Sequence, residues 1–393
     1  MDAALRRQFN AQWTPEKYAR FLQLIDEGSG THVAFRNCET PCFLSSSLVE
    51  KMADYGRELV LQLTGSAEYR KRSDATIPAE FHVRKEDPLP MFLQVDFGIA
   101  EGLEPKLVEI QAFPSLYAYQ PFLAESYKQV YGLDPSLNCF LDGRNAGSYQ
   151  ELLREAILGG HPPENVILLE IDPTHQKTRC DFTLTERLLG VCAVCITEVH
   201  QSGHELWYHR DGKRVPIHRI YNRAIVDELV RKNVKPGFDL TGDLDVEWAG
   251  HPNWYFRISK FSIPYLKHAC VPQTWFLNEL RETPRDLENY VLKPLYSFAG
   301  LGVVVGPAQA DIDAIPDAHR ADYILQERIN FIPTIDTPHG PTKAEVRVMY
   351  VWPPGALEPL ATTTIIRMGR GKMMGVDQNK NMEWVGASAA FLV

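Results

Sequence analysis

Between residues 148 and 235 the sequence alternates between helix-like and strand-like apolar patterns. Helical periodicity is found in SYQELLREAILGG, CDFTLTERLLG and AIVDELVRKN, and strand patterns in NVILLEID, VCAVCITEV, ELWYH and RVPIHRIYNR. Strands that alternate with helices form parallel sheets, because each crossover helix returns the chain to the same edge. We therefore expect a small parallel α/β domain at 148–245.

The flanking regions have a different order of predicted helices and strands, and the whole sequence therefore predicts a chain of mixed α/β and α+β class. Residues 1–147 contain helical periodicity at 15–27 and 45–65, followed by the strand pair MFLQVDFGIA and PKLVEIQAF around a turn at 101–105. Residues 246–393 contain a helix with KFSIPYLKHA and the strands NYVLKPL, GVVVGP, YILQERI, EVRVMYVW and ATTTIIRM. This succession is typical of an α+β unit with a largely antiparallel sheet.

Charge and cysteine usage narrow the classes of partner. The net charge is −9 and no basic run reaches five residues, which argues against binding to a nucleic-acid backbone. No apolar run is long enough to span a membrane, and the first residues lack the pattern of a signal peptide. Seven dispersed cysteines do not suggest a disulfide framework. We expect a cytoplasmic protein; its oligomeric state is not legible.

The segment YVLKPLYSFAGLGVVVGP carries the strongest functional signal. Lys293 ends an apolar strand, and Gly300 and Gly302 lie in the loop before the next strand. A nucleoside triphosphate needs a fixed cation and backbone N–H groups that can approach its phosphates, and a lysine beside a glycine loop supplies both. The alternative is a surface lysine next to an ordinary glycine turn, and the motif is not a Walker A loop.

A second constellation lies on the strand pair near residue 100. Asp96 is on the first strand, and Glu109 and Gln111 are two residues apart on the second, so the last two share a face. Two carboxylates and an amide oxygen suit Mg²⁺ bound to substrate phosphates. These residues interrupt strongly apolar runs, although a solvated acidic face remains the plain alternative.

The order of these features resembles the ATP-grasp family of Mg-ATP enzymes. Lys260 opens a helix, a Val-Pro strand entry follows, and the Lys293 strand, the glycine loop and a strand ending in Gln326-Glu327 come next. The resemblance implies that both lysines contact the phosphates of ATP. It also implies that the hinge at Gln326, Glu327 and Ile329 holds adenine and that Glu345 holds the ribose.

The acidic constellation precedes the lysines, an order that resembles the permuted ATP-grasp arrangement of glutathionylspermidine synthase and eukaryotic-type glutathione synthetase. In that comparison 148–245 is an inserted, pre-ATP-grasp-like substrate domain, and the similar region spans roughly residues 80–393. Residues 1–147 then provide N-terminal helices and the metal-binding hairpin, and 246–393 the ATP-binding part. Asp96, Glu109 and Gln111 correspond to the Mg²⁺ ligands.

Two positions depart from the family pattern. Gln111 replaces an asparagine, and Gln94 stands where the family has an arginine that steadies the developing oxyanion. Stabilising charge where it develops is a large catalytic contribution, so another cation must replace that arginine or the reaction must differ. Arg84 and Arg370 are possible replacements, but Arg347 and Arg367, on adjacent predicted strands, are the preferred catalytic candidates. Arg219 and Arg223 are candidates for binding a substrate carboxylate.

The resemblance implies an ATP-dependent carboxylate–amine ligase that forms an amide through an acyl phosphate. Its partners would be ATP, Mg²⁺ and small-molecule carboxylate and amine substrates, with neither nucleic acid nor membrane. Two alternatives stay open. The chain could be a nucleotide-binding relative with altered catalysis, given Gln94 and Gln111, or a phosphotransferase without an amine acceptor.

Overall fold

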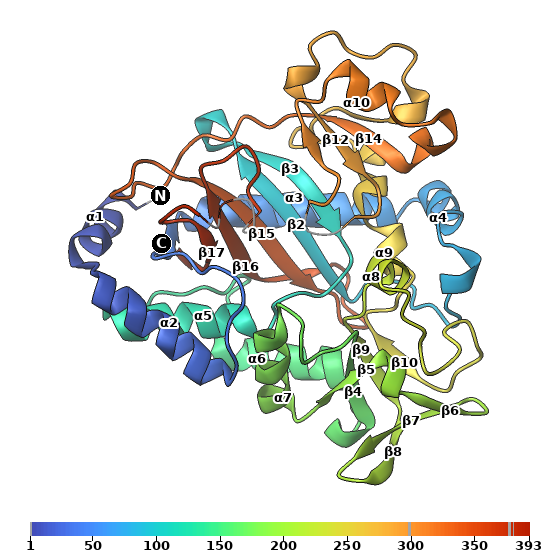
Figure 1. The fold of residues 1–393 in the computed structure, drawn as a ribbon. Coiled ribbons are helices and arrows are strands. Elements are labelled where there is room, and N and C mark those ends of the chain that lie inside the picture. Colours follow the sequence, from blue (N-terminus) through green and yellow to red (C-terminus); the bar gives the residue numbers. More distant parts are fainter. Residues whose placement is uncertain (1, 298–299, 376–378, 380) are drawn as a thin grey trace.

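The computed structural model describes residues 2–297, 300–375, 379 and 381–393. Its strands form several separate sheets, and helices lie between and around them (Figure 1). The mixed α/β class expected from the sequence is confirmed. Among the described residues, no helix is both long and apolar enough to cross a membrane.

A five-stranded antiparallel sheet occupies the centre of the molecule, in the order β17-β16-β15-β2-β3. Its strands are β2 (Phe92–Ile99), β3 (Pro105–Gln111), β15 (Lys343–Val351), β16 (Leu360–Gly369) and β17 (Gly386–Ser388). The predicted hairpin is confirmed as β2 and β3, joined through a short 3-10 turn, η2 (Glu101–Leu103), in which Gly102 has φ 70°. Segments from both ends of the chain therefore build one sheet.

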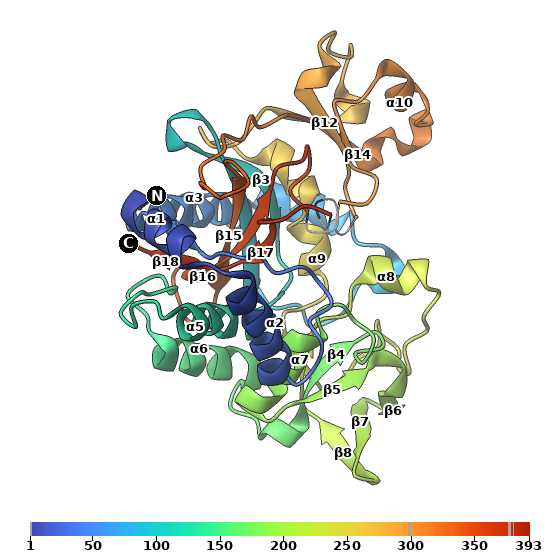
Figure 2. The same ribbon diagram turned by 60° about the vertical axis from the view of Figure 1, so that its left-hand side comes forward.

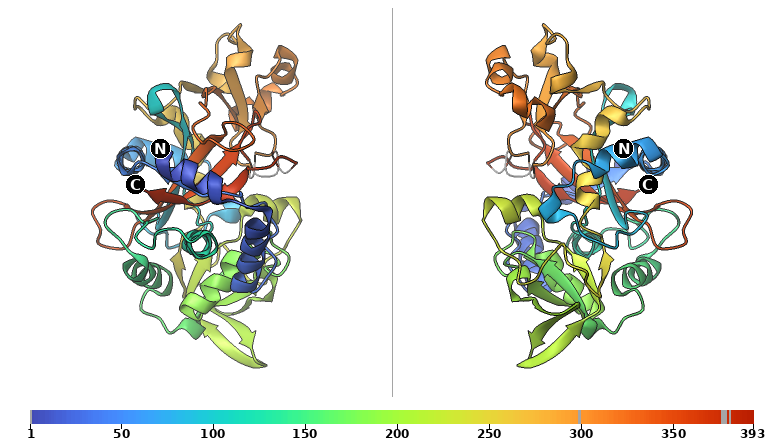
Figure 3. Two further views of the ribbon diagram at one scale, coloured as in Figure 1. Left: turned by 90° about the vertical axis from the view of Figure 1, so that its left-hand side faces the viewer. Right: turned by 90° about the vertical axis from the view of Figure 1, so that its right-hand side faces the viewer.

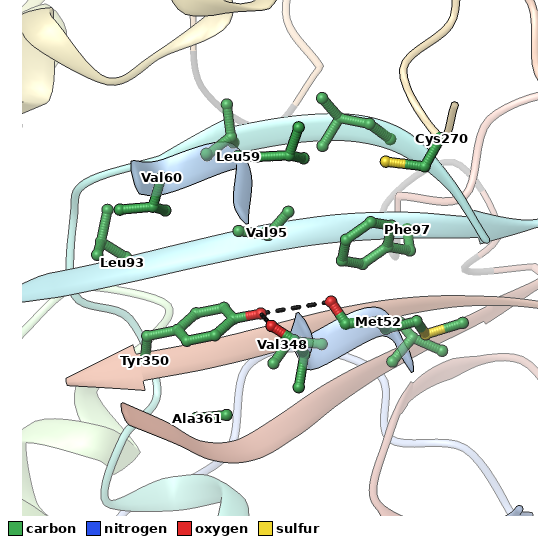
Figure 4. Close-up of a cluster of buried hydrophobic side chains, with 14 of the residues drawn as sticks. Met52, Leu59, Val60, Leu93, Val95, Phe97, Cys270, Val348, Tyr350 and Ala361 are labelled. Atoms are coloured by element: carbon green, nitrogen blue, oxygen red, sulfur yellow. Dashed lines mark hydrogen bonds between the residues drawn. The ribbon is translucent and has the colours of Figure 1, made fainter. Parts of the chain in front are cut away.

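One face of this sheet is apolar and packs on helix α3 (Ser46–Thr64). Figure 4 shows Leu59 and Val60 of the helix beside Val95 of the sheet, and Met52 of the helix beside Val348. The alternation of the strands sends these side chains to one face and the polar residues between them to the other. The Tyr350 hydroxyl crosses this layer and donates a hydrogen bond to the Ala53 carbonyl at 2.9 Å.

The opposite face is divided. Its part near Phe92 and Met349 is apolar and belongs to a core shared with helices α2 (Pro15–Ser29), α5 (Tyr119–Tyr131) and α6 (Ala146–Leu158). The two termini lie close to each other, beside α1 and β18 (Figure 2). There β1 (Cys42–Leu44) pairs in parallel with β18 (Ala390–Leu392), and α1 (Ala3–Gln12) lies beside β1. The remaining part of the face is polar.

The parallel pairing predicted for 148–245 is found in a second sheet, in the order β10-β9-β4-β5, whose strand β10 lies just beyond residue 245. Its elements are β4 (Val166–Glu170), α7 (Arg179–Leu189), β5 (Cys192–Cys195), β9 (Arg219–Asn222), α8 (Val226–Arg231) and β10 (Glu247–Ala249). The predicted strand RVPIHRIYNR is in fact two strands, because its first half joins a projecting antiparallel sheet. That sheet consists of β6 (His200–Ser202), β7 (Glu205–Arg210) and β8 (Lys213–Ile217).

The late part of the chain forms a smaller antiparallel sheet, β11-β14-β12-β13, in a lobe above the central sheet (Figure 1). Its elements are β11 (Thr274–Phe276), β12 (Tyr290–Pro294), β13 (Val304–Val305), α10 (Gln309–Asp313), η8 (Asp317–Asp322) and β14 (Tyr323–Glu327). The strand predicted from GVVVGP is thus only two residues long. The helix predicted around KFSIPYLKHA is a short 3-10 helix, η5 (Lys260–Tyr265), because Pro264 lacks an N–H for a longer helix.

The shorter elements connect these layers, which Figure 3 shows from two sides. They are α4 (Ala67–Asp74), η1 (Ala79–Phe81), η3 (Pro163–Asn165), η4 (Ile196–Glu198), α9 (Trp254–Arg257), η6 (Leu277–Glu279) and η7 (Leu287–Asn289). The predicted phosphate loop and the C-terminal segment are described only in part, since residues 298–299, 376–378 and 380 lie outside the described residues.

Candidate functional site

The polar part of the central sheet is set by strand register. Asp96 of β2 lies directly opposite Glu109 on β3 and opposite Arg347 on β15. On the next strand pair, Glu345 lies opposite Arg367 of β16. Residues that face each other in adjacent strands share a face, so acids and arginines from four strands meet there.

Asp96 is the centre of this cluster. One carboxylate oxygen accepts a hydrogen bond from Arg347 Nε at 2.5 Å, and the other accepts from Arg347 Nη2 at 2.7 Å and from Arg367 Nη2. Burial by itself raises the pKa of Asp96, but the two guanidinium groups outweigh it and lower that pKa below its ordinary value. Asp96 is therefore a charged carboxylate held between two arginines.

Glu345 extends the cluster on the other side of Arg367. Its carboxylate lies 2.6 Å from Arg367 Nη2. Burial raises the pKa of Glu345, and the neighbouring Asp96 adds to the effect while Arg367 opposes it. The predicted ribose-binding acid is thus bound to an arginine of the same sheet.

Arg347 fills the space beside Gln94, the position at which the sequence lacks the expected arginine. Its Nη1 donates to Gln94 Oε1 at 2.9 Å. The same oxygen accepts from Gln111 Nε2 at 2.8 Å, and Gln94 Nε2 donates to the Ser115 carbonyl at 2.8 Å. The structure therefore places the Arg347 cation next to Gln94, and the amide nitrogen of Gln111 faces the Gln94 oxygen.

Lys260 lies next to this face because the 3-10 helix η5 packs against β3. Its Nζ is 3.2 Å from the Glu109 carboxylate and donates to the Ser297 carbonyl at 2.8 Å. Lys260 is buried, with only 5% of the residue exposed. Lys260, from the late part of the sequence, and Glu109, from the early part, therefore form a direct ion pair.

Lys293, on β12, also points toward β3. Its Nζ donates to the Val108 carbonyl at 2.9 Å and to Gln326 Oε1 at 2.5 Å. Burial lowers the pKa of Lys293 to about 8; nearby Glu109 opposes that shift and Lys260 reinforces it. The Lys293 ammonium is thus buried where the β11-β14-β12-β13 sheet meets β3 of the central sheet.

The other predicted nucleotide-binding residues lie around this junction. Gln326 is buried and binds Lys293, whereas Glu327 is exposed and its carboxylate accepts from the Gln273 N–H at 3.3 Å. Ile329 is half-buried, and its carbonyl accepts from Phe331 N–H at 3.2 Å. Gly300 and Gly302 have φ values of 75° and 72°, a backbone conformation that favours glycine.

A small pocket opens beside the Lys260–Glu109 pair. Its walls include Phe113, Tyr255 and Tyr296, and Ser297 lies next to Lys260 at its edge. Tyr255, Tyr296 and Ser297 were not among the residues expected at the site. Tyr296 and Ser297 could have been found from their position in the sequence, because they follow closely after the strand that carries Lys293.

The two predicted substrate arginines are both buried in the parallel domain. Arg219 donates to the carbonyls of Ala156 and Ile157 and pairs with Glu247 at 2.5 Å, so its donors are used inside the protein. Arg223 donates to the Pro114 carbonyl, and its guanidinium carbon lies 5.5 Å from the Phe113 ring. Only Arg223 is therefore connected to the pocket, through Phe113.

The predicted Mg²⁺ ligands do not form an open set in this arrangement. Both oxygens of Asp96 are bound by arginines, and Gln111 presents its amide nitrogen to Gln94. Among the described residues, no three histidine, cysteine or acidic side chains gather in a way that could hold a metal ion. The donors therefore do not fit a resident divalent cation.

The charge of the site instead suits an anion. Four cations, Lys260, Lys293, Arg347 and Arg367, are close to three carboxylates, Asp96, Glu109 and Glu345. A positive excess next to a pocket attracts phosphate or carboxylate groups. No protein-family model matches this chain, and no curated protein matches its sequence.

Proposed function

We propose that this protein is an ATP-dependent carboxylate–amine ligase. One observation carries the proposal: the acidic hairpin near residue 100 and the lysines near residues 260 and 293 meet in space. The ion pair between Glu109 and Lys260 at 3.2 Å and the contact of Lys293 with β3 are the direct evidence of that meeting. A triphosphate site built from both segments requires this convergence, and lysines located away from the hairpin could not form it.

The cationic residues of the site suit the phosphate-binding part of such a reaction. Lys260 and the two arginines would neutralise phosphate oxygens, a role for which charge-assisted hydrogen bonds are strong. A substrate carboxylate oxygen would attack the γ-phosphorus of ATP, which releases ADP and forms an acyl phosphate. An amine nitrogen would then attack the acyl carbon, phosphate would leave with the C–O electrons, and the nitrogen would lose a proton.

The test is ADP release from purified protein with ATP and pooled carboxylates, amino acids and polyamines. Ligase activity predicts ADP release that depends on both a carboxylate and an amine. With hydroxylamine in place of the amine, an acyl phosphate would be trapped as a hydroxamate. Amine-independent ADP release that gives a phosphorylated hydroxyl, without hydroxamate, would identify a phosphotransferase and refute the ligase.

A second candidate is a nucleotide-binding protein without ligase chemistry. The occupied carboxylate of Asp96 and the turned amide of Gln111 favour it, because neither offers oxygen ligands to a metal. This candidate predicts saturable ATP binding in equilibrium dialysis but no ADP release with any substrate pool. Turnover with a carboxylate and an amine would reject it.

A further inference from the structure

Asp96 makes its side-chain contacts with the arginines of the neighbouring strands. Arg347 binds both of its oxygens through Nε and Nη2, and Arg367 binds one of them. A carboxylate that accepts a fork of guanidinium donors is fixed in plane and has little capacity left for a metal ion. These contacts indicate that Asp96 positions the two guanidinium groups.

Arg367 still has capacity to bind a ligand, whereas each guanidinium nitrogen of Arg347 already donates to Asp96 or Gln94. Arg367 Nε is buried and has no hydrogen-bond partner among the described residues, although 24% of the side chain is exposed. A buried donor without a partner costs free energy, so a ligand acceptor that reaches it is favoured. Arg347 lies near Arg367, because both arginines donate to the same oxygen of Asp96.

We infer that Arg367, positioned by Asp96 beside Arg347, binds the anionic ligand of this face directly, so that binding does not require a divalent cation. The inference rests on the proposed function for the identity of that anion, a triphosphate. A guanidinium group is always charged and matches phosphate oxygens with two donors, which lets it take over the charge neutralisation that a metal ion usually supplies.

The role of Asp96 gives different expectations in the two cases. If Asp96 positions the arginines, Asp96→Asn keeps only one acceptor oxygen for their donors and weakens triphosphate binding equally in EDTA and in Mg²⁺. If Asp96 were a metal ligand, the same change would weaken binding in Mg²⁺ and leave binding in EDTA unchanged. Comparison of the two conditions therefore separates the two roles, and urea unfolding of the variant identifies a general loss of folding.

The experiment is calorimetric titration of the full-length protein with tripolyphosphate and, separately, with ATP, each in EDTA and in Mg²⁺. We expect dissociation constants that agree within about threefold between the two conditions. Arg367→Gln should weaken binding about tenfold or more, as the loss of a charged hydrogen bond predicts. Arg214→Gln is the matched control, because this exposed arginine lies on β8 of the projecting sheet.

The outcomes distinguish the inference from the proposed function. Binding of either ligand only in Mg²⁺, or of neither ligand under any condition, overturns the inference. Tripolyphosphate binding in EDTA without ATP binding upholds the inference and refutes the proposed function.

A direct metal measurement completes the test. Mn²⁺ added to the protein without nucleotide is followed by its electron paramagnetic resonance signal. We expect that the protein does not bind Mn²⁺ stoichiometrically through Asp96, so that Asp96→Asn leaves the signal unchanged. Stoichiometric Mn²⁺ binding that depends on Asp96 would overturn the inference even if the anion titrations agreed with it.

Discussion

The Glu109 carboxylate lies 3.2 Å from the Lys260 ammonium, although the two residues belong to opposite parts of the sequence. β3 carries the acid on the central sheet, and the short helix η5 brings the lysine against that strand. Because both side chains line the small pocket, the ion pair marks where the early and late halves of the site meet.

The first prediction concerns Lys260. Replacing it by alanine removes the cation nearest the pocket, so we expect ATP affinity to fall about tenfold or more, as for loss of a charged hydrogen bond. Equilibrium dialysis with labelled ATP measures the change. Lys267→Ala is the matched control, since Lys267 is exposed beyond the end of η5. Equal affinities for the two variants would remove Lys260 from the site.

The second prediction concerns the pH dependence that Lys293 gives to folding. Burial lowers the pKa of Lys293 to about 8 from an ordinary value of 10.5, and the unfolded chain keeps the ordinary value. Between these two pH values the unfolded state binds more protons than the native state, so stability rises with pH. Below pH 8 both states are protonated and the cost of the buried charge is fully present.

We therefore expect wild type to gain on the order of 3 kcal/mol relative to Lys293→Met between pH 8 and pH 10.5. Urea unfolding across this range measures the difference. Lys267→Met provides the control and should follow wild type. Parallel curves for wild type and Lys293→Met would show that the Lys293 pKa is not lowered.

The third prediction concerns the buried charges around Asp96. Asp96→Ala leaves Arg347 and Arg367 without their shared carboxylate, and removing one partner of a buried ion pair costs about 3–5 kcal/mol. Asp54→Ala is the control, because Asp54 pairs with Arg57 at the surface and its side chain is 61% exposed. That change should cost no more than about 1 kcal/mol. Similar unfolding free energies for the two variants would contradict the buried network.

The fourth prediction concerns Glu170 at the end of β4. Burial raises its pKa to about 8 from an ordinary 4.5, even though Arg223 opposes the shift. Between these values the native state binds more protons than the unfolded state, so wild type loses stability as pH rises from 4.5 to 8.

Glu170→Gln removes this loss while keeping an oxygen that can accept from the Ile171 N–H. The variant should become more stable than wild type as pH approaches 8, by on the order of 4 kcal/mol. Thermal and urea unfolding measure the difference, and the exposed Glu151→Gln should show none. A constant difference across the pH range would contradict a raised pKa.

The fifth prediction concerns the contact between α3 and the central sheet shown in Figure 4. A Cβ at Gly56 would lie 2.0 Å from Tyr350 Oη, so Gly56→Ala should destabilise by about 1–3 kcal/mol despite better helix propensity. Tyr350→Phe alone loses one hydrogen bond, about 1 kcal/mol. In the double variant the clash is reduced because the hydroxyl is absent. The loss of unfolding free energy in the double variant should therefore be smaller than the sum of the losses in the two single variants. Strict additivity in urea unfolding would refute the contact.

Much of the local structure could be predicted from the sequence, because periodicity and turn residues act within a few residues. The β2–β3 hairpin, strands β15 and β16 and the alternating units of the parallel domain were identified in this way. Errors occurred where a local signal was overridden. Pro264 limits η5 to a short 3-10 helix, and the strand RVPIHRIYNR is divided between two sheets.

The sequence by itself determined which residue types were available to the candidate site: early acids on an apolar hairpin and late lysines beside glycines. Only the tertiary structure decided which of them touch. Strand register placed Arg347 and Arg367 on Asp96, and sheet packing placed Lys260 on Glu109 and directed Arg219 into its own domain. The physical reason is that side-chain pairing across strands depends on contacts between segments far apart in the chain, which no local pattern encodes.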